Sequence, residues 1–204
     1  MRLVTTSDIL ADTFGDLEAV RILASNGFDA IDWSFFNMER QPAWQGNDWR
    51  EHAMEIRRTA EDCGIGFGQS HAPFPTSTGE EEKDKAILAV ILRSMEAASI
   101  LGCHSIIIHP RQHLVYAKNK KQLFQENVAF YTSLIPYCEQ FGIHVCVENM
   151  WQYDHKRHII VDSVCAQPEE FCAMIDVIHS PWITACLDIG HAALVGVDPA
   201  DAIR

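Results

Sequence analysis

Hydrophobic residues are arranged along the chain in two patterns, short continuous runs and longer stretches in which they occupy one face of a helix. Short continuous apolar runs bounded by turn residues are typical of strands that are buried on both faces. They predict strands over residues 3–6, 28–33, 65–70, 104–108, 143–147 and 183–187. Longer stretches with apolar residues on one helical face predict helices over 16–26, 48–62, 80–101, 120–141 and 168–178, and a last helix that begins at Asp198-Pro199.

Four of the predicted helices end in the same way, with one glycine followed by an apolar strand. The junctions are Asn26-Gly27-Phe28, Cys63-Gly64-Ile65, Leu101-Gly102-Cys103 and Phe141-Gly142-Ile143. Glycine is common just past the end of a helix. The repetition indicates βα units with short return loops, of which six can be counted. Pro136 lies inside the 120–141 stretch and predicts a kink or a split there.

The loops that follow the strands are longer than those that follow the helices, and they carry the unusual residues. We therefore predict an α/β fold, the (β/α)8 TIM barrel, which builds its sites on that face. A doubly wound open sheet is the alternative, but four of the six strands end in ligand-type residues, which favours a closed ring. Because barrels of this kind contain about 250 residues, we expect one domain over residues 1–204 from which two βα units are missing.

Ligand-type side chains stand at the ends of four predicted strands. They are His71 after the third strand, His109 after the fourth, Glu148 at the fifth, and Asp188 with His191 at the sixth. A carboxylate at the end of a buried strand is costly to bury unless it is paired or bound to a metal. If the strands are parallel neighbours, these side chains meet at one rim, which predicts a metal site. The alternatives are a structural Glu148 paired with a histidine or arginine, an Asp188 that caps the next helix, and structural histidines.

Two further segments contain residue types that are common in binding sites. Trp33 ends the second strand, where it is either a wall that stacks on a sugar or a contact at the barrel rim. The glycine-rich segment 64–68 is not a dinucleotide fingerprint, because it leads into a strand and does not open a helix. We predict Trp33 to be a candidate substrate-binding residue.

Composition narrows the class of partner. The chain has 204 residues, of which 48% are hydrophobic and 22% charged, enough for a sizeable core. Its formal net charge of -12, with one short basic block at 118–121, disfavours nucleic acid and favours small polar substrates. Seven cysteines without a CxxC pair, no signal-peptide pattern and no apolar run long enough for a bilayer predict a cytoplasmic protein.

These motifs resemble those of the sugar phosphate isomerase/epimerase family of xylose isomerase-like TIM barrels, which includes ketose 3-epimerases, inosose dehydratases and hydroxypyruvate isomerases. Endonuclease IV shares the fold. The resemblance covers the whole chain and rests on Ser70-His71-Ala72-Pro73, His109, Val147-Glu148-Asn149 and Asp188-Ile189-Gly190-His191.

The resemblance implies roles for individual residues. It makes Glu148 and Asp188 ligands of a divalent metal. It places His191 on the substrate in the epimerases and on metal in the endonucleases. His71 and His109 are metal ligands in the endonucleases and lie nearer to substrate in the epimerases. The family completes its metal site with a histidine and a second glutamate from the last two strands, for which this sequence has no positions.

The leading hypothesis is a metal-dependent isomerase or epimerase that acts on a small-molecule sugar, with Glu148 as the catalytic base. Mn²⁺, Mg²⁺ or Co²⁺ fits mixed oxygen and nitrogen ligands, and Zn²⁺ fits if the histidines bind directly. The absence of an arginine cluster at a strand end favours an unphosphorylated substrate. We expect no nucleic acid and no membrane as partners, and a homo-oligomer is compatible with the sequence.

Two alternatives remain. One is an endonuclease IV-like zinc phosphodiesterase that acts on abasic DNA, which the negative net charge disfavours. The other is a truncated, non-catalytic barrel.

Overall fold

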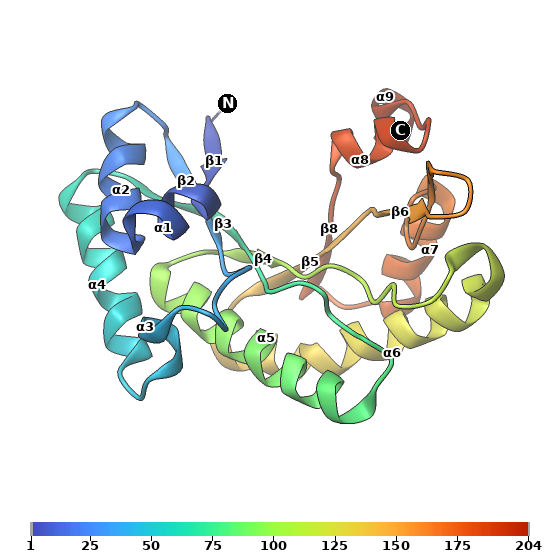
Figure 1. Ribbon diagram of the computed structural model, residues 1–204, viewed down its shortest axis with the longest axis horizontal. Coiled ribbons are helices and arrows are strands. Elements are labelled where there is room, and N and C mark those ends of the chain that lie inside the picture. Colours follow the sequence, from blue (N-terminus) through green and yellow to red (C-terminus); the bar gives the residue numbers. More distant parts are fainter. Residues whose placement is uncertain (1, 204) are drawn as a thin grey trace.

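A computed structural model describes residues 2–203 and shows a curved parallel sheet with helices along its outer side (Figure 1). Six strands pair in the order β1-β2-β3-β4-β5-β8, and every pairing is parallel. They are β1 (Val4–Thr6), β2 (Ala30–Ser34), β3 (Gly66–His71), β4 (Ser105–Ile107), β5 (His144–Glu148) and β8 (Ile183–Cys186). The predicted α/β barrel architecture is confirmed, and no strand within 2–203 joins β8 to β1.

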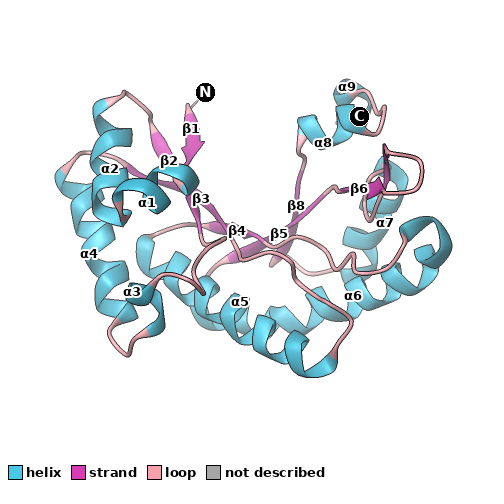
Figure 2. Cartoon of the chain, in the orientation of Figure 1, coloured by secondary structure: helices cyan, strands magenta, loops and turns pink. Residues whose placement is uncertain are grey.

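The long helices lie along the convex side of the sheet (Figure 2). The helices are α1 (Asp8–Phe14), α2 (Asp16–Ser25), α3 (Pro42–Gln45), α4 (Trp49–Asp62), α5 (Glu81–Leu101), α6 (Tyr116–Phe141), α7 (Pro168–Ile178), α8 (Ile189–Leu194) and α9 (Pro199–Ala202). None of these helices is long and apolar enough to cross a membrane.

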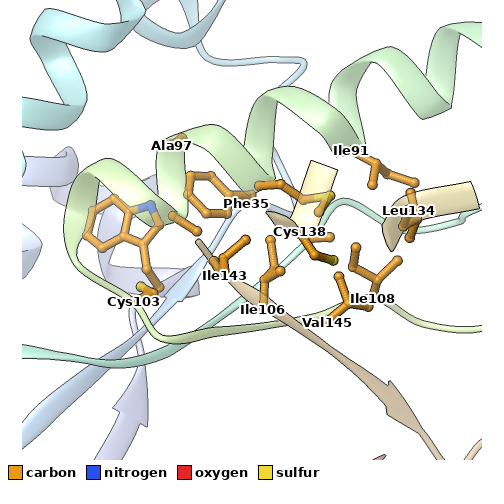
Figure 3. Close-up of a cluster of buried hydrophobic side chains, with 14 of the residues drawn as sticks. Phe35, Ile91, Ala97, Cys103, Ile106, Ile108, Leu134, Cys138, Ile143 and Val145 are labelled. Atoms are coloured by element: carbon orange, nitrogen blue, oxygen red, sulfur yellow. The ribbon is translucent and has the colours of Figure 1, made fainter. Parts of the chain in front are cut away.

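The hydrophobic core lies between the sheet and the long helices. Figure 3 shows Ile106 and Val145 of the sheet beside Leu134 and Cys138 of α6. These four side chains are fully buried. Burying a side chain of this size contributes about 1.5–3 kcal/mol, so strand residues that face the helices stabilise the fold. Side chains on the opposite, concave face are available to form a binding or catalytic site.

Three features differ from the sequence predictions. An antiparallel hairpin, β6 (Trp151–Asp154) with β7 (Ile159–Asp162), follows β5 and was missed, because its turn contains no glycine and instead uses His158 at a φ of 54°. The short helices α1, α3 and α8 were also not predicted. Pro136 lies within α6, whose non-helical residue is Asn119, so the expected kink lies near the start of the helix.

One irregularity in the sheet positions the site. Ile31 pairs with Phe67, but the next residue, Asp32, pairs with Gln69, so Gly68 is an extra residue in β3. Such a β-bulge shifts the alternation of the side chains that follow it. A Cβ atom at position 68 would lie 3.3 Å from Cγ1 of Val4, so a side chain there would require Val4 to shift by a few tenths of an ångström.

Candidate metal and substrate site

The predicted metal ligands Glu148 and Asp188 lie together with the predicted substrate-binding residues His71, His109 and His191, at the carboxyl ends of β3, β4, β5 and β8. They form two groups whose ligand atoms all lie within 4.8 Å of one another. One group is His71, His109 and Glu148, and the other is Glu148, Asp188 and His191. Glu148 belongs to both. The structure therefore brings together the residues that the strand ends predicted, around one shared carboxylate.

Glu148 is buried, with 3% of its surface exposed. Its Oε2 lies 2.8 Å from Nε2 of His109, and its Oε1 lies 3.9 Å from Nδ1 of His191. Despite this short distance, Oε2 of Glu148 is buried without a hydrogen-bond partner among residues 2–203. A divalent cation held by the ligand groups would supply that partner, because a buried carboxylate is costly unless it is paired or coordinates a metal.

Asp188 caps helix α8 with only one of its two carboxylate oxygens. Its Oδ1 accepts a 2.7 Å hydrogen bond from the backbone N–H of His191 at the start of α8, while Oδ2 lies 3.9 Å from Nε2 of the same histidine. The side chain of Asn149 holds the residue in place, since it donates to the carbonyl of Asp188 and accepts from its N–H. Capping and metal binding are therefore compatible at Asp188.

The backbone also fixes the ring of His191. Its Nδ1 lies 2.8 Å from the carbonyl oxygen of Asn149. A carbonyl can only accept, so Nδ1 carries the hydrogen and Nε2 of the neutral ring is left with its lone pair. Asn149 therefore holds Asp188 through its side chain and His191 through its carbonyl. The sequence analysis did not predict either role, although Asn149 directly follows Glu148 at the strand end.

Asp32 and Gln69 complete the surroundings of His71, and neither was predicted. Oδ1 of Asp32 lies 2.9 Å from Nδ1 of His71, and Oδ2 accepts a 2.8 Å hydrogen bond from Gln69. Burial disfavours the imidazolium of His71, but the hydrogen bond to Asp32 and the nearby carboxylates outweigh burial and raise the pKa of His71 above its ordinary value.

The donor atoms of the two groups suit a divalent cation. The first group offers two imidazoles and one carboxylate, a set that zinc accepts, and the second offers two carboxylates and one imidazole, which also suits Mn²⁺ or Co²⁺. Nδ1 of His109 is also buried without a hydrogen-bond partner among residues 2–203, and the ring of this histidine packs against those of Phe74 and His71.

A cavity of about 330 Å³ opens beside these ligands. It is lined by Phe74, His109, Gln112, Met150, Trp151, Gln152, Tyr153 and His191. The ring of Phe74 stands edge-on to His109 at 5.0 Å between centroids, and Trp151 stands edge-on to His191 at 6.3 Å. The cavity thus combines aromatic walls with ligand-type histidines, and its size is at the small end for ligand sites.

The structure does not support Trp33 as a substrate-binding residue. Only 1% of its surface is exposed, and its ring packs edge-on against Phe67 at 5.9 Å within the core. Trp33 alternates with Asp32 along β2, so when Asp32 faces the site, Trp33 faces the helices. Phe74 and Trp151 are the aromatic residues that line the cavity, and both lie outside the six predicted strands.

Comparison with known proteins agrees with the architecture. The family model described as xylose isomerase-like TIM barrel matches residues 20–204. No curated protein matches the sequence. Among solved structures, a D-psicose 3-epimerase determined in the presence of D-fructose is similar, with a TM-score of 0.77 at 18% identity over 100% of this chain and 69% of that one.

Two other solved structures are also similar. A 3-keto-D-glucoside 4-epimerase from E. coli has a TM-score of 0.76 at 15% identity, with 100% of this chain and 74% of that one covered. A D-tagatose 3-epimerase-like protein has a TM-score of 0.68 at 20% identity, with 94% and 66% covered. The chain spans about two thirds of the length of the solved structures it matches, and likeness at this identity shows the fold alone.

Proposed function

Because the chain belongs to the xylose isomerase-like TIM-barrel family, we propose that it is a metal-dependent isomerase or epimerase acting on a small sugar or sugar derivative. The observation that carries the proposal is the position of Glu148, a buried carboxylate shared by two groups of candidate metal ligands. The known activities of the similar epimerases support this choice of reaction class.

The chemistry requires removal of a proton from a carbon next to a carbonyl. A divalent cation held by Glu148, Asp188 and the histidines would supply the positive charge that polarises this carbonyl and acidifies the neighbouring C–H. Glu148 is the carboxylate at the centre of the groups, and we assign to it the removal and the return of the proton. Return to the neighbouring carbon gives isomerisation, whereas inversion at the same carbon needs a donor on the opposite face.

The remaining side chains bind and orient the substrate in this scheme. Phe74 and Trp151 offer apolar faces to the C–H groups of a sugar. Gln152 holds the hairpin against the loop after β4, because its side chain bonds to the backbone of Tyr116, Gln112 and Leu114. The hairpin wall of the cavity is thus fixed to the segment between β4 and α6.

A zinc phosphodiesterase is the second candidate. The group His71, His109 and Glu148 favours it, because two imidazoles and a carboxylate are a common zinc set. The net charge of -12 opposes it, since DNA binding needs a basic face. A salt-sensitive gel shift with abasic DNA would favour this candidate over the isomerase.

The proposal is tested by metal content and melting temperature with and without Mn²⁺ or Zn²⁺, on the wild type and on the double variant Glu148→Gln with Asp188→Asn. We expect the metal to raise the melting temperature of the wild type only, because ligand at 100 times its Kd stabilises by about 2.7 kcal/mol. Unphosphorylated ketoses are then screened as substrates. A wild type that neither binds nor responds to a divalent metal would contradict the proposal.

A further inference from the structure

Asp32 is buried on the concave face of the sheet, and both of its oxygens are used. Oδ1 lies 2.9 Å from Nδ1 of His71, and Oδ2 accepts from Nε2 of Gln69 at 2.8 Å. A buried carboxylate is costly unless it is hydrogen-bonded or paired. An ionised carboxylate can only accept hydrogen bonds. In this arrangement Nδ1 of His71 therefore carries the hydrogen.

This hydrogen bond determines what His71 presents to the site. With Nδ1 held by Asp32, the nitrogen left to coordinate is Nε2, on the side of the ring away from Asp32. His71 lies beside His109, with 5.8 Å between ring centroids, and forms a ligand group with His109 and Glu148. A carboxylate behind a ligating histidine fixes its tautomer and its orientation and makes the other nitrogen a stronger ligand.

The bulge at Gly68 brings the three side chains to one face. In an unbroken register Asp32 would pair with residue 68, and residues 69 and 71 would fall on the face of Trp33, which packs on the helices. The extra residue moves Gln69 and His71 to the face of Asp32. Val4 lies too close to position 68 for a side chain to fit without displacement.

We propose that Asp32 is the positioning residue for His71, supported by Gln69 and by the bulge at Gly68. Asp32 acts through His71 and does not itself touch metal or substrate. This inference rests on the metal-dependent function proposed above, and it adds residues that neither the strand-end motifs nor the two ligand groups contain.

The chain offers a matched control. Asp16 forms an equally short contact with a histidine, 2.7 Å from its Oδ2 to Nε2 of His52, and it also accepts from Nε1 of Trp44. This cluster lies among α2, α3 and α4, outside the two ligand groups. Asp16→Asn therefore removes the same kind of charge from a similar environment without touching the site.

The test measures Zn²⁺ and Mn²⁺ affinity by competition with a chromophoric chelator, on the wild type, Asp32→Asn and Asp16→Asn. Loss of an outer partner of a metal-binding histidine typically weakens binding about 10–100-fold. We expect that loss in Asp32→Asn and wild-type affinity in Asp16→Asn. A folded Asp32→Asn variant with wild-type affinity would overturn the positioning role.

A second measurement needs neither metal nor a variant. Nitrogen-15 NMR of the metal-free wild type, at a pH where the ring is neutral, reports the tautomer of His71, and we expect the hydrogen on Nδ1. A neutral ring with its hydrogen on Nε2 overturns the inference even if Asp32→Asn fails to fold. If the wild type shows the expected tautomer but binds no metal, the proposed function fails while the orienting contact stands.

Discussion

The molecule contains two largely buried aspartate–histidine pairs whose exposure and contact distances are similar. The Asp32 side chain is 11% exposed and that of Asp16 is 8% exposed, and both partner histidines are 19% exposed. Asp16 and His52 join helices α2 and α4, whereas Asp32 and His71 join β2 and β3. The two pairs differ in what lies beyond the histidine.

Beyond His71 lie His109 and Glu148 at ligand distance, whereas His52 joins no group of three ligand-type side chains among residues 2–203. The ring of His52 instead packs edge-on against Trp44 at 5.0 Å. The comparison teaches that a buried aspartate–histidine pair can belong to a metal site only where other ligand-type side chains lie next to its histidine. Burial is similar in the two places, and in each the aspartate contacts one histidine nitrogen and accepts one further hydrogen bond.

The largest effect on stability is expected on the helix-facing side of β2. Trp33→Ala should lower the free energy of unfolding by about 3–5 kcal/mol, because it leaves a large cavity in the core. Urea unfolding measures this loss. Trp151→Ala is the matched change on the cavity side. It should cost much less stability and weaken substrate binding, and a reversal of the two results would return Trp33 to the site.

A smaller loss is expected at the outer pair. Asp16→Asn should lower the free energy of unfolding by about 1–3 kcal/mol, because it disturbs buried hydrogen bonds to His52 and Trp44. Urea unfolding and metal titration on the same sample give both quantities. A change in metal affinity as large as that of Asp32→Asn would mean that the two pairs do not differ in function.

The smallest effect on stability is expected in the cavity wall. Phe74 is 42% exposed, so Phe74→Leu should change the free energy of unfolding by no more than about 0.5 kcal/mol. Loss of its aromatic face should weaken sugar binding by about 0.5–1.5 kcal/mol, if the contact is similar in strength to an aromatic pair in proteins. Calorimetric titration with the best ketose from the screen measures this, and unchanged binding would exclude Phe74 from the substrate surface.

Much of the fold, and the meeting of the candidate site residues at one rim, could be predicted from the sequence for a definite physical reason. Apolar runs that end in histidine or a carboxylate identify strand ends, and parallel strands bring those ends together. His71, His109, Glu148, Asp188 and His191 could therefore be predicted without knowing the strand register.

Asp32 and Trp33 could not be assigned in the same way. Ile31-Asp32-Trp33-Ser34 alternates between apolar and polar residues, which places Asp32 and Trp33 on opposite faces of the strand but does not indicate which face carries the site. The bulge at Gly68 is also not visible, because one extra residue leaves the apolar pattern of β3 intact. The hairpin after β5 was missed because His158 takes the left-handed backbone conformation that usually indicates glycine or asparagine.

The strand order of the sheet also bears on biosynthesis. Neighbouring strands pair residues that are 26 to 39 positions apart along the chain, and each strand joins one that was made before it. Because synthesis proceeds from the N-terminus, each βα unit can dock on a template already present on the ribosome. We therefore expect the group of His71, His109 and Glu148 to assemble once β5 has emerged, and the group containing Asp188 to assemble only after β8, so that a nascent chain forms its two candidate ligand groups in a fixed order.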